Sequence, residues 1–294
     1  MQGYFQQAIV ESAPMAIPFR TYDQYLTPGV LLAEELHCNY QDLDCIRSAS
    51  VDSIIEAQRL VDKKITSFDA LLFFEAWVPV IDHILVHGQL YQTVQNVSFT
   101  LKPLIIGTNN DEGQSFIYDQ WTQVVSPTFY GEIALAIFKQ KALKVLERYP
   151  PMGLGDQRPR LAHIATEWVF ICPARIFARH TPSYTYVFGY PLIQNVSLNH
   201  SFCSDHVCHG DELPFVFQSN WTNFNEIQRY ISSNVGIYWT NFAKTQNPNQ
   251  PFNVSIIWPN AQGINENYLY FQNPLEIRGN YSKDDCDFWD QIGY

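Results

Sequence analysis

The stretch Cys208-His209-Gly210-Asp211-Glu212-Leu213-Pro214-Phe215-Val216-Phe217 indicates the fold most strongly. In it, His209 stands between a cysteine and a flexible glycine, and an apolar run follows that returns the chain to the core. A histidine that projects from such a turn has the chemistry of a general base. An isolated histidine beside a glycine is more often an ordinary loop residue, so the interpretation needs a second observation.

That second observation is KPLIIGTNNDEG, residues 102–113, where an apolar strand runs into a polar turn closed by Gly113. Such a strand delivers Glu112 to its carboxyl end. In α/β-hydrolases the catalytic acid precedes the histidine along the chain, and both lie on loops at the same edge of the sheet. Glu112 and His209 keep this order. The alternative is that Asp111 and Glu112 only solvate a loop.

Residues 107–113 and 208–215 resemble the acid and histidine motifs of type-B carboxylesterases, the cholinesterase-like family. Five further stretches are similar to that family and keep its order: residues 3–12, 38–45, 77–82, 170–173 and 286–289. The resemblance implies an α/β class fold, here a partial α/β-hydrolase with the carboxyl-terminal strands of the central sheet and flanking helices. It also implies that Ser12 supports the acid and the histidine.

The family's nucleophilic serine lies in a Gly-x-Ser-x-Gly pentapeptide, and none occurs in these 294 residues. We therefore expect residues 1–294 to form the carboxyl-terminal fragment of one carboxylesterase type-B domain, with Met1 internal to a longer protein. The resemblance implies a serine-esterase mechanism with His209 as base and Glu112 as acid, acting on a small carboxylic ester. Without its nucleophile, the chain alone is expected to be inactive.

A second hypothesis is a secreted cholinesterase-like protein without catalytic activity, used for adhesion, storage or structure. The presence of both Glu112 and His209 argues against it. The sequence indicates no cofactor and leaves the oligomeric state open.

The composition excludes several classes of partner. The chain is 46% hydrophobic and 15% aromatic, which is typical of a globular protein with a large core. A net charge of −11 without a basic run argues against nucleic acid and anionic membranes. Because no apolar run approaches about 20 residues, we expect no membrane span.

The cysteines and asparagines predict a secreted protein. The resemblance pairs Cys38 with Cys45 and Cys172 with Cys286, and proximity then leaves Cys203 to pair with Cys208. The first 30 residues contain no signal peptide, so secretion is expected of a longer protein. Six glycosylation sequons occur, at Asn96, Asn195, Asn199, Asn220, Asn253 and Asn280.

A zinc site is the rival interpretation of the third cysteine pair. Thiolates and imidazoles at short spacing are suitable zinc ligands, and Cys203, His206, Cys208 and His209 provide them. Zinc would occupy the lone pair that a general base requires, so we expect no metal here.

The spacing of apolar residues predicts the main elements and no linker between domains. Helices are expected at residues 25–36, 51–60, 133–149, 161–179 and 227–243. A buried strand is expected at residues 5–10, another strand at 183–190 and a late edge strand at 268–272. Residues 115–130 are expected to be irregular and to provide a wall of the acyl pocket.

Overall fold

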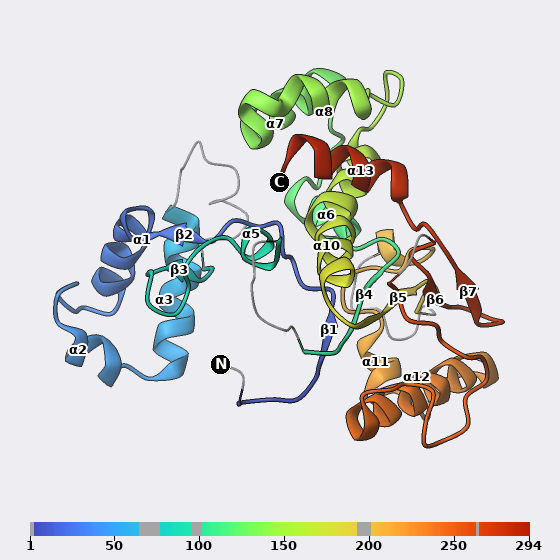
Figure 1. The fold of residues 1–294 in the computed structure, drawn as a ribbon. Helices are drawn as coiled ribbons and strands as arrows, with labels where there is room; N and C mark the ends of the chain where they lie inside the picture. Colours follow the sequence, from blue (N-terminus) through green and yellow to red (C-terminus); the bar gives the residue numbers. More distant parts are fainter. Residues whose placement is uncertain (1–2, 65–76, 96–101, 193–200, 263–264) are drawn as a thin grey trace. The chain divides into compact units, whose positions relative to one another are not determined.

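A computed structural model describes residues 3–64, 77–95, 102–192, 201–262 and 265–294 (Figure 1). The chain forms two compact units. The sheet unit contains residues 1–16, 94–130 and 149–294, and the helical unit contains residues 17–93 and 131–148. Because each unit is assembled from separate segments, no single linker divides them, and the division was not predicted from the sequence.

The sheet unit is built on a five-stranded sheet in the order β1-β4-β5-β6-β7. The first four strands are parallel, and β7 is antiparallel to β6. The strands are β1 (Ala8–Glu11), β4 (Leu104–Asn109), β5 (Ser183–Phe188), β6 (Tyr268–Phe271) and β7 (Glu276–Arg278). Asn109 is paired with Phe188, so the carboxyl ends of β4 and β5 meet at one edge of the sheet. This arrangement confirms the predicted α/β class.

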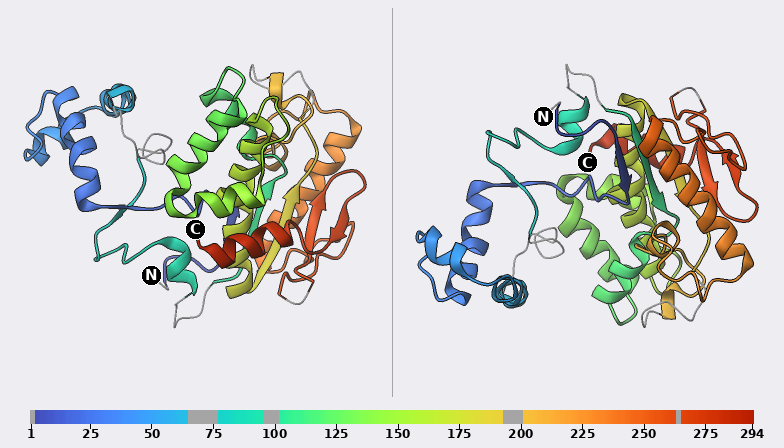
Figure 2. Two further views of the ribbon diagram at one scale, coloured as in Figure 1. Left: turned by 90° about the horizontal axis from the view of Figure 1, so that it is seen from above. Right: turned by 90° about the horizontal axis from the view of Figure 1, so that it is seen from below.

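Helices cover both faces of the sheet, which explains why every residue of β4 is buried. The helix α10 (Cys172–His180) lies against one face, where Ile106 and Val187 line a small cavity with it. The helix α12 (Glu226–Thr245) packs on the other face with Ile105. Ile105 and Ile106 point to opposite sides because neighbouring strand residues alternate. Figure 2 shows α10 and α12 on the two sides of the sheet.

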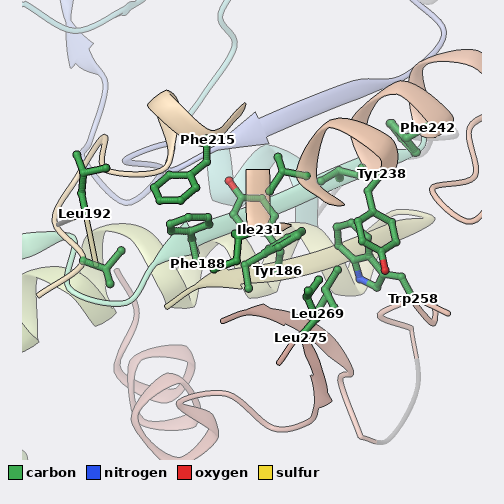
Figure 3. Close-up of a cluster of buried hydrophobic side chains, with 14 of the residues drawn as sticks. Tyr186, Phe188, Leu192, Phe215, Ile231, Tyr238, Phe242, Trp258, Leu269 and Leu275 are labelled. Atoms are coloured by element: carbon green, nitrogen blue, oxygen red, sulfur yellow. The ribbon is translucent and has the colours of Figure 1, made fainter. Parts of the chain in front are cut away.

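A cluster of buried hydrophobic side chains lies between the sheet and α12 (Figure 3). Phe188 of β5 contacts Phe215 with ring centroids 5.0 Å apart. Phe215 belongs to the short helix α11 (Leu213–Val216), which begins four residues after His209. Phe215 anchors this end of the histidine stretch in the core as predicted, whereas Leu213 and Phe217 of the same run are exposed.

Two strands differ from expectation in their surroundings. The strand β1 is half-buried, because it lies at one edge of the sheet and pairs only with β4 among the described residues. The strand β6 is not an edge strand, because β7 pairs with its outer side. The short β7 was not predicted from the sequence.

Two further predictions of secondary structure are wrong, one for a helix and one for an irregular stretch. The expected continuous helix at residues 133–149 is broken into α7 (Pro127–Phe138), a 3₁₀ turn (Lys139–Lys141) and α8 (Ala142–Arg148). Lys139 has a positive φ of 49°, which an α-helix cannot accommodate. The stretch at 115–130 is not irregular throughout, because α6 (Gly113–Gln120) covers its first third.

The predicted helix at 161–179 is present, with a change of winding in its middle. It consists of α9 (Arg158–Ala165), a π-helical segment η2 (Thr166–Ile171) and α10. In the described part of the chain, Arg158–His180 is the one helix long and apolar enough to cross a membrane, but 83% of its most apolar window is buried inside the protein. A core helix of a globular protein has this property.

The helical unit contains α1 (Tyr22–Glu35) and α3 (Val51–Lys64), close to the predicted ranges, and α2 (Leu43–Ser48), which was not predicted. Thr21 and Gln24 form a capping box at the start of α1. Two short strands, β2 (Arg20–Thr21) and β3 (Val80–Ile81), pair in parallel. The remaining described helices of the chain are α5 (Leu90–Gln95), η3 (Ser201–Cys203) and α13 (Lys283–Ile292).

Candidate active site

The structure brings together the two residues that the sequence proposed as base and acid. His209 Nδ1 lies 2.7 Å from Glu112 Oε2. Glu112 is completely buried, whereas 37% of the His209 side chain is exposed. A buried carboxylate therefore holds one nitrogen of an imidazole whose ring still reaches solvent.

Glu112 is positioned by the end of β4 and the start of α6. Its Oε1 accepts a hydrogen bond of 2.6 Å from the backbone N–H of Asn109, the last residue of β4. The next residue, Gly113, allows α6 to approach α9 closely, because a Cβ there would lie 2.4 Å from the carbonyl oxygen of Ala162. The Gly113 N–H donates to Thr166 Oγ1 at 2.9 Å. The carboxylate is thus fixed by backbone packing on both sides.

The loop of His209 is attached to the same turn. The Asp111 N–H donates to the Val207 carbonyl and the Val207 N–H donates to Asp111 Oδ2, both at 3.0 Å. The Cys208 N–H donates to Asp211 Oδ2 at 2.7 Å. Gly210 has a φ of +87°, a conformation that glycine adopts without strain. These contacts fix the backbone on both sides of His209.

A disulfide further closes this loop. Cys203 and Cys208 are bonded to each other, so no thiolate is available there and the zinc interpretation of Cys203, His206, Cys208 and His209 is wrong. The two other expected disulfides are also present. One links Cys38 to Cys45, and the other links Cys172 of α10 to Cys286 of α13.

Two aromatic rings flank the imidazole. The ring centroids of Phe116 and Phe170 lie 5.1 Å and 5.3 Å from that of His209. Burial by itself lowers the pKa of His209, but the hydrogen bond to Glu112 and its negative charge outweigh burial, and the pKa is raised above its ordinary value. The pair therefore stabilises an imidazolium, which is what a general base becomes when it takes a proton.

Asn109 and Glu212 also belong to the site, although the sequence argument did not select them. Asn109 Nδ2 donates to the Cys208 carbonyl at 2.8 Å and also to Glu212 Oε2. Glu212 is buried, and burial together with the charge of Glu112, partly opposed by the Asn109 hydrogen bond, raises its pKa to about 7. Both residues lie inside the two stretches quoted above, but their contact joins positions 103 residues apart and has no local signal.

Ser12 lies at the carboxyl end of β1, where its N–H donates to the Gly107 carbonyl at 2.9 Å. It is buried, its φ is 52°, and its hydroxyl has no hydrogen-bond partner among the described residues. Its supporting role toward the acid and the histidine stays a prediction. The neighbouring Glu11 accepts a 2.6 Å hydrogen bond from Trp239 Nε1, and burial raises the pKa of Glu11.

The parallel sheet and the His209–Glu112 pair at its carboxyl edge define an α/β-hydrolase-like fold. The family model of the carboxylesterase family matches residues 1–289, and the chain belongs to that family. The fold comparison agrees, since a solved structure of a PNB esterase superposes with a TM-score of 0.74 at 21% identity, over 98% of this chain and 58% of the esterase.

Several relatives match along almost the whole chain. The cAMP-regulated D2 protein of Dictyostelium discoideum is 29% identical over 290 residues, which cover 96% of this chain and 54% of that protein. The Crystal protein of the same organism is 30% identical over 311 residues, which cover 100% of this chain and 56% of that protein. Neuroligin-2 of Rattus norvegicus is 24% identical over 334 residues, which cover 98% of this chain and 38% of that protein. The chain thus spans about half the length of its Dictyostelium relatives.

The sequons differ in their surroundings. Asn253 and Asn280 are exposed. Asn220 is half-buried, and its Nδ2 atom, to which a glycan would be attached, is buried. Asn96, Asn195 and Asn199 lie outside the described residues.

Proposed function

We propose that these residues form the acid–base part of a serine carboxylic-ester hydrolase. In a polypeptide that also contains a Gly-x-Ser-x-Gly segment, His209 acts as the general base and Glu112 as the acid that orients it. The observation that carries the proposal is the 2.7 Å contact between His209 Nδ1 and the buried Glu112 Oε2. This contact leaves Nε2 as the nitrogen that can accept a proton.

The reaction then proceeds in two balanced steps. His209 Nε2 takes the proton of a serine hydroxyl while the serine oxygen bonds to the ester carbonyl carbon. The imidazolium returns that proton to the leaving alkoxide, an alcohol departs and an acyl-serine ester remains. In the second step His209 takes a proton from water, the hydroxide adds to the acyl carbon, and the proton goes to the departing serine oxygen. Glu112 stays ionised and stabilises the imidazolium in both steps.

The chain without a nucleophile tests one half of the proposal. We expect residues 1–294 alone to show no hydrolysis of p-nitrophenyl acetate that an organophosphate can block, because loss of the nucleophile removes most of the catalysis of a triad. Organophosphate-sensitive turnover by the purified chain would contradict the proposal.

A joined polypeptide tests the other half. Residues 1–294 are placed in frame behind a carboxylesterase-family segment that contains Gly-x-Ser-x-Gly, and organophosphate-sensitive turnover is expected. Glu112→Gln and His209→Ala should each lower kcat by about 10⁴-fold. His206→Gln and Glu226→Gln are matched controls at exposed or partly exposed positions outside the pair, and they should retain activity. If the Glu112 and His209 variants kept the kcat of the unsubstituted joined polypeptide, the assigned roles would be refuted.

A non-catalytic function is the second candidate. It is favoured by relatives whose names, such as Crystal protein and Neuroligin-2, are not those of esterases. The joined polypeptide separates the two: a soluble, folded product with no turnover supports the non-catalytic function.

We also propose that the protein passes through the secretory pathway. All six cysteines form disulfides, which persist in oxidising compartments. The exposed sequons Asn253 and Asn280 are suitable glycosylation sites.

A further inference from the structure

Three side chains from two segments of the sheet unit, the continuous helix Arg158–His180 and α13, converge outside the histidine loop. His163 comes from α9, Glu167 from η2 and Asp285 from α13. His163 Nδ1 lies 3.9 Å from Glu167 Oε1, and His163 Nε2 lies 3.7 Å from Asp285 Oδ2. One potential ligand atom from each residue lies within 4.8 Å of the other two. We propose that His163, Glu167 and Asp285 bind a divalent transition-metal cation of the Zn²⁺ class.

The donor set matches this class of cation. Zn²⁺ binds imidazole nitrogen and carboxylate oxygen at about 2.0–2.2 Å, so ligand atoms around one ion lie roughly 3–3.5 Å apart. The two short contacts involve different nitrogens of His163, whereas one ligand atom from each residue lies within 4.8 Å of the other two, so binding one ion requires the side chains to move closer together. An imidazole favours Zn²⁺ over Mg²⁺, which prefers oxygen ligands and retains its water.

The charges at this cluster also favour a cation. Two carboxylates face one imidazole, and Glu167 is 3% exposed. Two carboxylate charges beside one imidazole favour the binding of a cation.

Neighbouring hydroxyl groups already hold the two carboxylates. Ser282 Oγ donates to Glu167 Oε1 at 2.7 Å. The Tyr149 side chain is hydrogen-bonded to Asp285, and Trp289 Nε1 donates to the Tyr149 hydroxyl oxygen at 3.0 Å. Such contacts orient metal ligands and keep them from rotating away.

The backbone around the cluster is also held in place. The disulfide between Cys172 and Cys286 links α10 to α13 immediately beside it, so α13 is fixed before any ion binds. The His163 side chain is 43% exposed and that of Asp285 is 22% exposed, which gives an ion access from solvent. A bound ion would connect α13 to α9 and η2, and would therefore stabilise the carboxyl-terminal helix.

The test uses the full chain after treatment with a chelator and its removal. At pH 7.5, calorimetry should show one equivalent of ZnCl₂ bound, and zinc should raise the thermal midpoint, whereas MgCl₂ should not. Because a metal must displace the proton of His163, zinc affinity should fall by at least tenfold at pH 5.5.

Variants locate the site. His163→Gln and Asp285→Asn should each abolish the zinc-dependent rise in thermal midpoint, measured against their own metal-free midpoints so that a lower basal stability does not affect the result. The controls are Asp284→Asn, an exposed neighbour on α13, and His87→Gln, an exposed histidine of the helical unit. Both should retain the rise. No zinc effect on the unsubstituted chain, or an equal effect in His163→Gln, would overturn the proposal.

Discussion

His209 Nδ1 and Glu112 Oε2 are 2.7 Å apart, although the two residues are separated by 97 positions in the sequence. Glu112 follows β4, and His209 follows the loop beyond β5, so the parallel pairing of these strands brings them to one edge of the sheet. The hydrogen bonds between Asp111 and Val207 then hold the two loops together. The contact is a consequence of strand order and needs no further element to explain it.

Glu212 should make stability depend on pH in a way that identifies it. Its pKa of about 7 in the folded protein lies above the value of an ordinary glutamate, so its unfavourable contribution is absent below about pH 4.5 and grows as the pH rises toward 7. Glu212→Gln removes this dependence. The free energy of unfolding of the variant relative to the unsubstituted chain should therefore rise between pH 5 and 7, by at most about 1.4 kcal/mol per pH unit. Urea unfolding at several pH values measures it, with the exposed Glu226→Gln as control. If the difference in the free energy of unfolding between Glu212→Gln and the unsubstituted chain stayed constant from pH 5 to 7, the raised pKa of Glu212 would be contradicted.

The three disulfides should differ in what they contribute to stability. The Cys172–Cys286 bond closes the longest loop, with a sequence separation of 114, against 7 for Cys38–Cys45 and 5 for Cys203–Cys208. The chain-entropy relation gives about 5 kcal/mol for the long loop and about 2 to 2.5 kcal/mol for the short ones. Paired Cys→Ala variants compared by urea unfolding test this order. An equal loss in the free energy of unfolding for all three pairs would show that loop length does not determine how much each disulfide stabilises the protein.

The edge strand β1 should make the isolated chain prone to association. The N–H groups of Ala8 and Ser12 donate to the carbonyls of Pro103 and Gly107, on the side of β1 that faces β4. Because N–H groups alternate in direction along a strand, the N–H of Ile9 points to the open edge. Ile9→Pro removes that outward donor and should lower the aggregated fraction in light scattering, while Ile9→Val should not. If the unsubstituted chain stayed monomeric and melted cooperatively, the expected association would be refuted.

Glycan occupancy should follow the exposure of each asparagine in the described residues. Expressed with a signal peptide in a eukaryotic secretory system, the chain should lose one glycan with Asn253→Gln and one with Asn280→Gln. Asn220→Gln should cause little change, because Nδ2 of Asn220 is buried. Mass spectrometry after glycosidase treatment measures occupancy. Full occupancy of Asn220 with none at Asn253 would contradict the argument.

The sequence was sufficient to predict the elements whose signals are local. The apolar run before Gly107 predicted β4, the helical spacing at 227–243 predicted α12, and the order of acid and histidine predicted which two loops meet. The two elements follow from periodicity and turn residues, which depend on neighbours in the chain, whereas the pairing of the two loops was inferred from the order of acid and histidine in α/β-hydrolases.

The features that the sequence did not reveal depend on distant contacts. Asn109 and Glu212 are hydrogen-bonded across 103 positions, so neither could be assigned to the site from its own stretch. The break at Lys139 has no glycine or proline to mark it, and the two units are assembled from segments that alternate along the chain.

The state of the His209 ring tests the central claim most directly. ¹⁵N chemical shifts of the imidazole should show Nδ1 protonated and Nε2 unprotonated above the pKa, with the pKa itself higher than that of an exposed histidine. In Glu112→Gln, burial remains while the charge of Glu112 is lost, so the pKa of His209 should fall. An Nε2-protonated ring in the unsubstituted chain, or a pKa unchanged by Glu112→Gln, would show that Glu112 does not prepare His209 as a base.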